Sequence, residues 1–167
     1  MKKQYVLIGV SLFICLFIYL FYRTERTLVN DLYIRLTSLD DHTKLKAYIV
    51  GRLPLPPVII YSLPEGLWMF CITLTSKPYF IAWKKWRLDC VYIPLLFCFS
   101  LEMLQLIHLT NGRFDLMDIY LFIVFWFLGR SVLTQPDEKQ NILGKFNTKM
   151  MVCVASYGIV YLAHVLK

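Results

Sequence analysis

Long apolar runs separated by short polar stretches make up most of this chain. A membrane core about 30 Å thick requires roughly 20 mostly apolar residues in a helix. Five runs approach this length and predict an all-α fold, a polytopic membrane bundle of about five helices that forms a single integral membrane domain over residues 1–167. The predicted spans are residues 5–22, 63–83, 90–107, 116–133 and 149–166.

The first run follows Met1-Lys2-Lys3, so it could be a secretory signal peptide or an uncleaved span. It is longer than the apolar part of a signal peptide, which has about 7–15 residues. The segment Arg23-Thr24-Glu25-Arg26 follows it in place of a small-residue cleavage site. We therefore expect an uncleaved first span.

Residues 23–57 form the long connection between the first two predicted spans. Leucines recur there at helical spacing, and they predict an amphipathic helix that lies on the outer face of the same membrane. Three prolines then prevent that helix from continuing into the second span. The leucines are Leu28, Leu32, Leu36 and Leu39, and the prolines are Pro54, Pro56 and Pro57.

The second predicted span begins with a Ser-x-x-Glu pattern from Ser62 to Glu65, which is typical of a capping box. Toward its other end, Pro78 is expected to kink the helix or to end it near the membrane interface. Lys77 would then extend its ammonium group to the lipid headgroups.

The composition supports a membrane location. Of the 167 residues, 58% are hydrophobic and 17% are charged, whereas average globular domains are about 45–50% apolar and about 25% charged. The mean hydropathy is +0.57. These values exclude a disordered chain, a nucleic-acid-binding domain and an ordinary soluble enzyme.

The distribution of the +7 net charge indicates partners and orientation. Basic residues lie at the ends of apolar runs and form no stripe for phosphates to follow, so membrane lipids are the expected partners and nucleic acid is not. Lysine and arginine counts favour a cytoplasmic N-terminus and an outer C-terminus by ten to eight. The short basic loops 84–89 and 134–148 decide this orientation, because residues 108–115 hold one arginine.

The cysteines and histidines predict no metal centre. The cysteines show neither a CxxC spacing nor a histidine at zinc-ligand spacing, so we expect small buried residues, no metal and no cofactor. Asp40-Asp41-His42 could be a metal corner or a helix cap, and the cap is favoured. His108 is expected to be solvated at the end of the third helix. The five cysteines are Cys15, Cys71, Cys90, Cys98 and Cys153.

Acidic residues and one arginine gather around the connection between the third and fourth predicted spans. A Glu-x-x-Gln pair shares one face of the third helix, and Asn111-Gly112 predicts a turn. An Arg-x-Asp-x-x-Asp pattern then opens the fourth helix. A tight hairpin would bring these side chains, together with Glu65, into one outward-facing pocket. The hairpin set is Glu102, Gln105, Arg113, Asp115 and Asp118.

Glu102 lies inside the third predicted span, where a charged side chain requires an explanation. An ionised carboxylate in a span costs at least about 2.5–3.5 kcal/mol, so Glu102 is protonated, paired or faces a water-filled cavity. Arg113 is the expected partner, because a guanidinium can bind a carboxylate through two hydrogen bonds. The structural alternative is that Asp115 caps the fourth helix, Asp118 favours its positive end, Glu65 completes the capping box and Glu102–Arg113 is a clamp.

The segments Glu102-Met103-Leu104-Gln105 and Gly112-Arg113-Phe114-Asp115-Leu116-Met117-Asp118 resemble the motif of the VanZ-like family of small bacterial membrane proteins. The resemblance covers about residues 60–133. It implies a multi-pass protein of the bacterial inner (plasma) membrane with a cell-envelope function. One named member of the family is associated with resistance to the glycopeptide antibiotic teicoplanin.

The chain departs from the family pattern after the last aspartate of the motif. The family usually has Asn, Gly and Gly at four, seven and eleven positions further on, where this chain has Phe122, Phe125 and Gly129. The chain would therefore be a divergent member. The sequence alone does not predict close packing of the fourth helix.

These residues are compatible with three functions, one of them disfavoured. The first is an outward-facing carboxylate–Arg pocket that binds or processes an envelope lipid or glycan precursor. The second is a non-enzymatic membrane accessory or partner-binding protein in which the polar cluster is a structural clamp. The third, a carrier, is disfavoured because no inverted repeat is present. In the first case Glu102 or Asp118 would be the general acid or base, and the binding groups would be Arg113, Gln105, Asp115 and Glu65.

Overall fold

A computed structural model gives the fold of residues 2–23, 33–34, 38–83, 85–109, 114–132, 139–144 and 147–165. These described residues are mostly helical, as predicted, and they include a small three-stranded sheet that the apolar pattern does not predict. The longer helices are α1 (Lys2–Phe21), α3 (Leu39–Arg52), α5 (Leu63–Ser76), α6 (Ile93–Leu106), α7 (Leu116–Ser131) and α8 (Thr148–Val165). The shorter elements are α4 (Pro57–Tyr61), η1 (Cys90–Tyr92), β1 (Tyr79–Trp83), β2 (Trp86–Asp89) and β3 (Gln140–Asn141).

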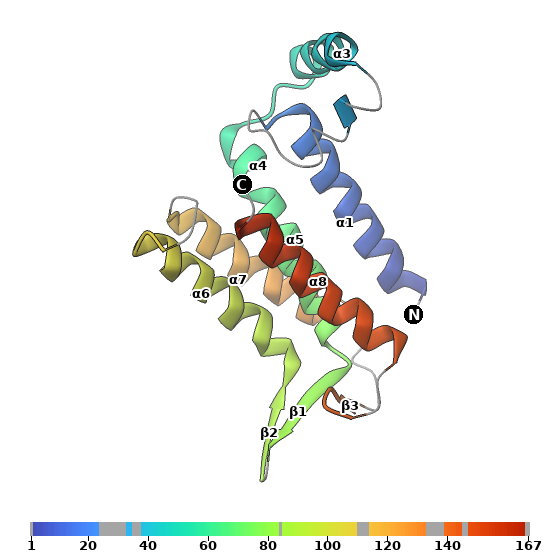
Figure 1. Cartoon of the computed structure of the whole chain (residues 1–167), viewed down its shortest axis with the longest axis vertical. Helices are drawn as coiled ribbons and strands as arrows, with labels where there is room; N and C mark the ends of the chain where they lie inside the picture. Colours follow the sequence, from blue (N-terminus) through green and yellow to red (C-terminus); the bar gives the residue numbers. More distant parts are fainter. Residues whose placement is uncertain are drawn as a thin grey trace.

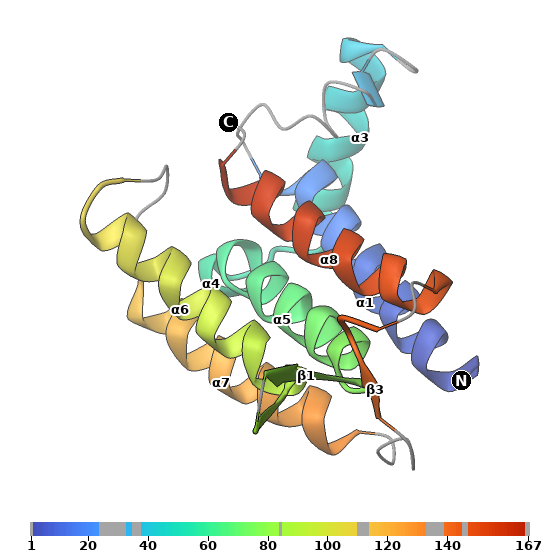
Figure 2. The same ribbon diagram turned by 60° about the horizontal axis from the view of Figure 1, so that its bottom comes forward.

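Helices α1, α5, α6, α7 and α8 form a bundle in which successive members alternate in direction (Figure 1). The end at which α1 finishes and α5 begins carries α3, and we call it the α3 end. The opposite end carries the three strands, and we call it the sheet end. Because of the alternation, α6 and α8 finish toward the α3 end, and α7 begins toward it (Figure 2).

The core of the bundle is α5, which contacts α1, α6, α7 and α8. Its residues are apolar or small around almost the whole circumference, so nearly all of them are buried. Met69 and Ile72 of α5 are fully buried and pack with Cys98 of α6 and Phe122 of α7. The arrangement of α1, α6, α7 and α8 therefore follows from the one helix that is apolar on every side.

The close approach of α5 and α7 depends on one glycine from each helix. A Cβ atom at Gly66 of α5 would lie 2.4 Å from Cδ2 of Phe125, so the aromatic ring fills the space that this glycine leaves. A Cβ atom at Gly129 of α7 would lie 3.0 Å from Cβ of Thr73. Phe125 stands at a position where the VanZ-like pattern has a glycine, yet α7 packs closely against α5. The reason is that Gly66 of α5 leaves room for the Phe125 ring.

The second predicted helix ends at Ser76 and does not extend to residue 83. Lys77 and Pro78 form a turn, and β1 follows. Pro78 lacks the N–H that a continuing helix requires, and the sequence Tyr-Phe-Ile-Ala-Trp suits a strand. β1 pairs antiparallel with β2 and parallel with β3. Of the two outcomes expected at Pro78, the structure confirms that the helix ends there.

Lys77 was expected to extend its ammonium group to the lipid headgroups, but the group is bound inside the protein. The residue is 5% exposed, and its Nζ donates hydrogen bonds of 2.9 Å to the carbonyl oxygens of Arg130 and Val132. These carbonyls lie at the C-terminal end of α7, where the helix dipole is negative. Burial and the nearby Lys139 ammonium lower the pKa of Lys77. Lys77 therefore attaches the end of α5 to the end of α7.

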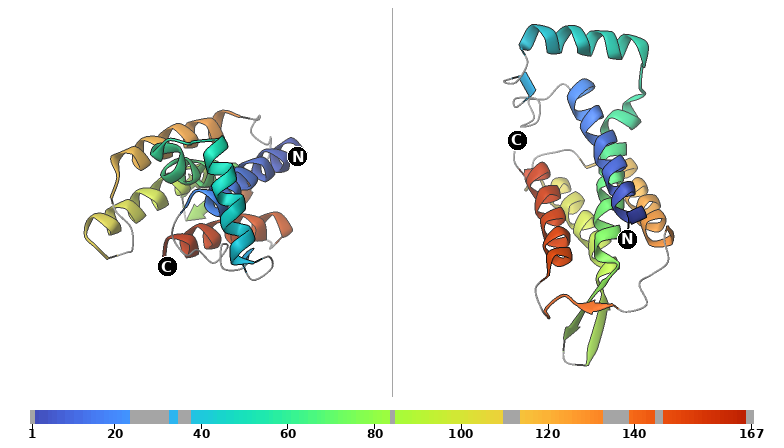
Figure 3. Two further views of the ribbon diagram at one scale, coloured as in Figure 1. Left: turned by 90° about the horizontal axis from the view of Figure 1, so that it is seen from above. Right: turned by 90° about the vertical axis from the view of Figure 1, so that its right-hand side faces the viewer.

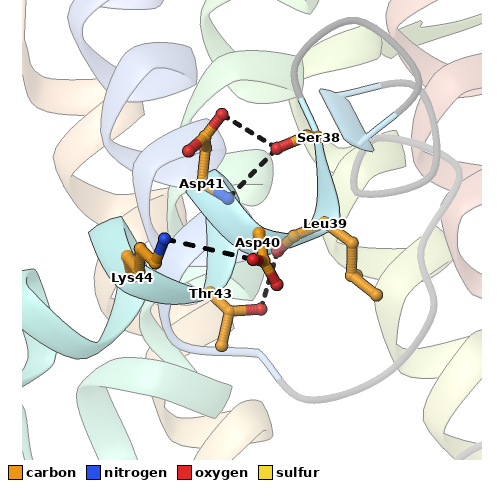
Figure 4. Close-up of polar contacts among 6 residues, drawn as sticks. All are labelled: Ser38, Leu39, Asp40, Asp41, Thr43 and Lys44. Carbon is orange, nitrogen blue, oxygen red and sulfur yellow. Dashed lines mark hydrogen bonds and ion pairs between the residues drawn. The ribbon is translucent and has the colours of Figure 1, made fainter.

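The long connection contains α3, which begins at Leu39. Ser38 caps it by accepting a hydrogen bond from the backbone N–H of Asp41 (Figure 4). The Asp40-Asp41-His42 segment was expected to cap a helix, but it lies in the first turn of α3 and Ser38 is the cap. The described residues contain no metal-binding group of histidine, cysteine and acidic side chains. The other leucines of the predicted surface helix, Leu28, Leu32 and Leu36, lie outside the described residues.

All five cysteines are buried and free, which confirms that they act as small hydrophobic residues. The Cys15 thiol of α1 lies 3.7 Å from the carbonyl oxygen of Pro64 in α5. The Cys153 sulfur of α8 lies 3.8 Å from the hydroxyl oxygen of Ser76. These thiols fill narrow spaces where α1 and α8 contact α5.

Within the described residues, α1 is the one helix long and apolar enough by itself to cross a membrane core. Its segment Lys3–Phe21 has 19 residues and a mean hydropathy of 2.3, and 17% of it is buried. Large exposed apolar side chains also occur on α6, α7 and α8. They include Leu96, Met103 and Leu106 on α6, Tyr120, Ile123 and Phe127 on α7, and Met151, Val152 and Val154 on α8.

Candidate functional site

The predicted site residues that the structure describes all lie toward the α3 end of the bundle (Figure 1). Glu65 is in the first turn of α5 and Asp118 in the first turn of α7. Glu102 and Gln105 are in the last part of α6, and Asp115 caps α7. Arg113 lies outside the described residues. The alternating directions of the helices bring the five described side chains to one end of the bundle.

Glu102 connects α6 to α7. The residue is 3% exposed, and its Oε2 accepts a hydrogen bond of 3.4 Å from the backbone N–H of Asp115. Asp115 in turn caps α7, because its Oδ1 accepts a hydrogen bond of 2.9 Å from the backbone N–H of Met117. The predicted cap at Asp115 is confirmed. The predicted proximity of Glu102 to the start of the fourth helix is also confirmed.

Gln105 is buried on the same side of α6, and His108 is not part of this group. Gln105 is 8% exposed, whereas His108 is exposed. His108 has a left-handed backbone with φ 57°, and its N–H donates to the carbonyl oxygen of Gln105 while the Leu109 N–H donates to that of Leu104. This pair of bonds is the Schellman pattern that ends a helix. His108 therefore stops α6, and its imidazole is solvated as predicted.

Arg23 was not among the predicted site residues, and it is the arginine that lies in this region within the described part of the chain. Its Nη2 lies 3.6 Å from Oε1 of Glu65 and donates a hydrogen bond of 2.9 Å to the carbonyl oxygen of Tyr61. The guanidinium also lies over the Tyr19 ring, 4.6 Å from its centroid. Arg23 follows the end of α1 directly, and a cation at the end of an apolar run was the signal that could have identified it.

Glu65 therefore serves in an ion pair, and the predicted capping box does not form. Ser62 has helical backbone angles, φ −101° and ψ −26°, and its side chain makes no capping hydrogen bond. The reason is that α4 precedes it: the Ser62 N–H donates to the carbonyl oxygen of Val58, and the Gly66 N–H donates to that of Ser62. The start of α5 thus continues a helical path from α4 and needs no cap.

Asp118 faces this ion pair from α7. The Ser62 hydroxyl, which is buried, lies beside the Asp118 carboxyl group, and the charges of Glu65 and Arg23 act on that group. Its Oδ1 is buried and makes no hydrogen bond within the described part of the chain, and the same holds for Nε of Arg23. One buried acceptor and one buried donor are therefore unoccupied in the same cluster.

We call Arg23, Ser62, Glu65 and Asp118 the α1–α5–α7 cluster. Glu65 and Asp118 lie in the first turns of their helices, where the positive end of the helix dipole stabilises a negative charge. Glu65 and Glu102 both lie close enough to the Cys98 thiol of α6 for their charges to act on it. The predicted acids that the structure describes therefore lie near one another, and the described cation among them is Arg23, which follows the end of α1.

A shallow apolar groove on α6 is separate from these polar groups. The residues that line it recur at helical spacing on the side of α6 opposite Glu102 and Gln105. They are Leu96, Phe99, Ser100, Met103, Leu104 and Ile107. The groove thus belongs to the exposed apolar surface of the bundle.

Comparisons with known proteins found no relative: no protein family matches the chain, and no curated protein or solved structure is significantly similar to it.

Proposed function

We propose that this chain is a multi-pass protein of the bacterial inner membrane with about five spans. The exposed apolar side chains on α1, α6, α7 and α8 support this proposal, because a bilayer would cover them. Polar residues such as Ser11, Thr73, Ser76 and Glu102 are buried inside the bundle instead. Apolar residues outside and polar residues inside are typical of helices that face lipid.

The helical path from α4 to α5 supports a second span of sufficient length. Backbone hydrogen bonds continue through Ser62, so a nearly unbroken helix runs from Pro57 to Ser76. At 1.5 Å per residue it extends about 30 Å, which matches a membrane core. We therefore propose that the second span is residues 57–76, shifted toward the N-terminus from the predicted 63–83.

We propose a cytoplasmic N-terminus, which places the sheet end inside and the α3 end outside. Support comes from the basic side chains that the sheet end carries at Lys85, Arg87 and Lys139, since cytoplasmic loops are rich in Lys and Arg. In this orientation the α1–α5–α7 cluster and Glu102 lie toward the outer surface, where envelope precursors are found.

We propose that this polar region binds a cell-envelope lipid or glycan precursor, in keeping with a divergent VanZ-like protein. The observation that carries the proposal is the pair of buried, unoccupied atoms, Nε of Arg23 and Oδ1 of Asp118. An unmade buried hydrogen bond costs about 1–3 kcal/mol, so a ligand that supplies both an anionic oxygen and a hydroxyl would recover that energy. A phosphorylated or hydroxylated headgroup has this chemistry.

If the chain catalyses a reaction, Glu102 or Asp118 is the proposed general acid or base. Arg23 would orient an anionic group, as a guanidinium presents a planar set of donors. Arg113, Gln105 and Asp115, which belong to the motif, remain proposed binding groups, together with Glu65, which does not belong to it. Asp115 contributes by holding Glu102 through its backbone N–H and by capping α7.

The test is the identity of lipids and glycolipids that remain bound to the purified full-length protein, measured by mass spectrometry. We expect the wild-type protein to retain a defined species that Asp118→Asn and Arg23→Gln lose. The matched controls, Asp40→Asn and Arg87→Gln, change exposed residues outside the cluster and should retain it. Retention by Asp118→Asn, which preserves shape, would contradict the proposal.

The alternative is a non-enzymatic accessory or partner-binding protein in which these groups clamp helices together. It is favoured by the Arg23–Glu65 ion pair, which joins α1 to α5, and by the Glu102–Asp115 hydrogen bond, which joins α6 to α7. A clamp predicts that Glu102→Gln lowers thermal stability and leaves bound lipids unchanged. A binding site predicts the loss of a bound species at unchanged stability for Asp118→Asn.

A further inference from the structure

Helix α3 is attached across the end of α1. The His42 imidazole Nε2 lies 3.1 Å from the carbonyl oxygen of Leu20, and the Lys46 Nζ donates a hydrogen bond of 2.9 Å to the carbonyl oxygen of Arg23. The last carbonyls of a helix have no partner within it. Because two side chains of α3 bind the carbonyls at and just beyond the end of α1, α3 has a defined position there.

The direction of α3 is crosswise to α1. In Figure 1, α3 is seen almost along its axis while α1 runs along the page. In the right-hand view of Figure 3, α3 runs across the end of the molecule, with α1 leading away from it. A helix that lies across the end of a membrane span runs parallel to the membrane surface.

The outward side of α3 is polar. Asp40 and Lys44 lie one turn apart and form an ion pair of 4.0 Å, and their side chains are 91% and 77% exposed. Figure 4 shows both side chains at the start of the helix, together with the Ser38 cap. This polar ridge lies on the side of α3 opposite His42, Lys46 and the other residues that face α1.

Two exposed apolar flanks lie between the polar ridge and the side that faces α1. Leu45 and Tyr48, three positions apart, form one flank, and they are 40% and 62% exposed. Leu39 and Val50, eleven positions apart and therefore on one face, form the other, with 64% and 38% exposed. Neither flank is needed to hold α3 on α1.

We infer that α3 lies in the plane of the membrane surface and inserts Leu39, Leu45, Tyr48 and Val50 among the lipid headgroups at the α3 end. The partner is the phospholipid surface itself. The crosswise direction places both flanks at the level where α1 leaves the bilayer. The Arg52 guanidinium lies over the Tyr48 ring, 5.4 Å from its centroid, and such aromatic and cationic side chains are enriched at membrane interfaces.

Insertion of apolar groups, and not attraction to anionic lipid, supplies the binding. α3 carries Asp40 and Asp41 against Lys44, Lys46 and Arg52, so its charges nearly balance. The association should therefore depend little on the fraction of anionic lipid. The inference requires that α1 crosses the membrane, and it is independent of any ligand at the α1–α5–α7 cluster.

The test uses the full chain in nanodiscs of phosphatidylcholine and phosphatidylglycerol. Single substitutions Tyr48→Cys and Leu39→Cys place a spin label on each flank, and Lys44→Cys is the matched position on the polar ridge. The native cysteines are buried, and unsubstituted protein taken through the same labelling measures their background. Collision rates with oxygen, which concentrates in lipid, and with a water-soluble nickel chelate then report the depth of each label.

We expect an oxygen-to-nickel accessibility ratio several-fold higher at the two flank positions than at the ridge, with the same result in nanodiscs of phosphatidylcholine alone. Equal ratios at the flanks and the ridge would show that α3 stands clear of the bilayer and would overturn the inference. Flanks shielded from both reagents would overturn it in favour of a protein partner or a second copy. Leu45→Cys provides an independent label on the Tyr48 flank.

Discussion

The guanidinium of Arg23 lies 3.6 Å from the carboxylate of Glu65, and this ion pair joins the end of α1 to the first turn of α5. Both side chains are 14% exposed, so the pair is largely withdrawn from solvent. The first predicted span is thus attached to the central helix by charge as well as by packing. Asp118 of α7 faces the same pair, which makes Arg23 the described cation among three helices.

Replacing Arg23 by Gln should lower the stability of the whole bundle. The change removes the Arg23 cation from a largely withdrawn ion pair, and breaking one side of such a pair costs on the order of 3 kcal/mol. Thermal unfolding in detergent, followed by circular dichroism, measures the effect. Arg87→Gln is the control, because that guanidinium is exposed on β2. Equal thermal unfolding midpoints for the two variants would show that the Arg23–Glu65 ion pair does not stabilise the bundle.

Gly66→Ala should loosen the contact between α5 and α7. The new methyl group would lie 2.4 Å from Cδ2 of Phe125, so the ring must move, and overpacking of this kind costs about 1–3 kcal/mol. Gly9→Ala is the matched control, since nothing lies within 4 Å of its Cβ position. The smaller side chain of Phe125→Leu should restore part of the stability lost in Gly66→Ala. A Gly66→Ala protein as stable as the Gly9→Ala protein would contradict the packing described for α5 and α7.

His108→Gly should preserve or raise stability, whereas His108→Val should lower it. The residue has φ 57°, a left-handed conformation that costs a side-chain-bearing residue roughly 1 kcal/mol and that glycine adopts freely. A β-branched valine is least compatible with it. Unfolding midpoints of the two variants provide the measurement. A loss of stability in His108→Gly would show that the imidazole, and not the backbone, ends α6.

Lys77→Met should destabilise the sheet end. The substitution keeps the apolar part of the side chain and removes the charged donor to the carbonyl oxygens of Arg130 and Val132. A hydrogen bond to a charged group contributes about 1.5–3 kcal/mol. Lys85→Met, which changes an exposed lysine of the hairpin, is the control. Hydrogen exchange at the C-terminal turn of α7 should accelerate in the first variant only. Unchanged exchange there would contradict the role of Lys77.

The helical parts of the fold could be predicted because period and polarity alone define them. The apolar runs locate α1, α6, α7 and α8 to within a few residues, and the cap at Asp115 follows from its position before Leu116. The strand at Tyr79–Trp83 could not be separated from a helix by apolar character. Its aromatic composition and Pro78 were the available signals, but the length expected of a membrane span favoured a longer helix.

The composition of the polar cluster could be predicted only in part. The approach of Glu102 to Asp115 depends on a short hairpin, so sequence proximity predicts it. The Arg23–Glu65 pair joins residues far apart in the chain, and only the packing of α1 on α5 shows it. Likewise, Ser62 matches a capping pattern, but the preceding α4 removes the need for a cap. Sequence patterns can predict hydrogen bonds between residues close in the chain. Contacts between residues on distant helices can be identified only once the fold is known.

The central claim is that several helices cross the membrane and that the α1–α5–α7 cluster and Glu102 face its outer side. Paired reporter fusions after Lys85, at the sheet end, and after Leu109, at the α3 end, test it most directly. One reporter is active only in the cytoplasm and the other only outside it. We predict cytoplasmic activity at Lys85 and outer activity at Leu109. Activity of both fusions on the same side, or cytoplasmic activity at Leu109, would contradict the claim.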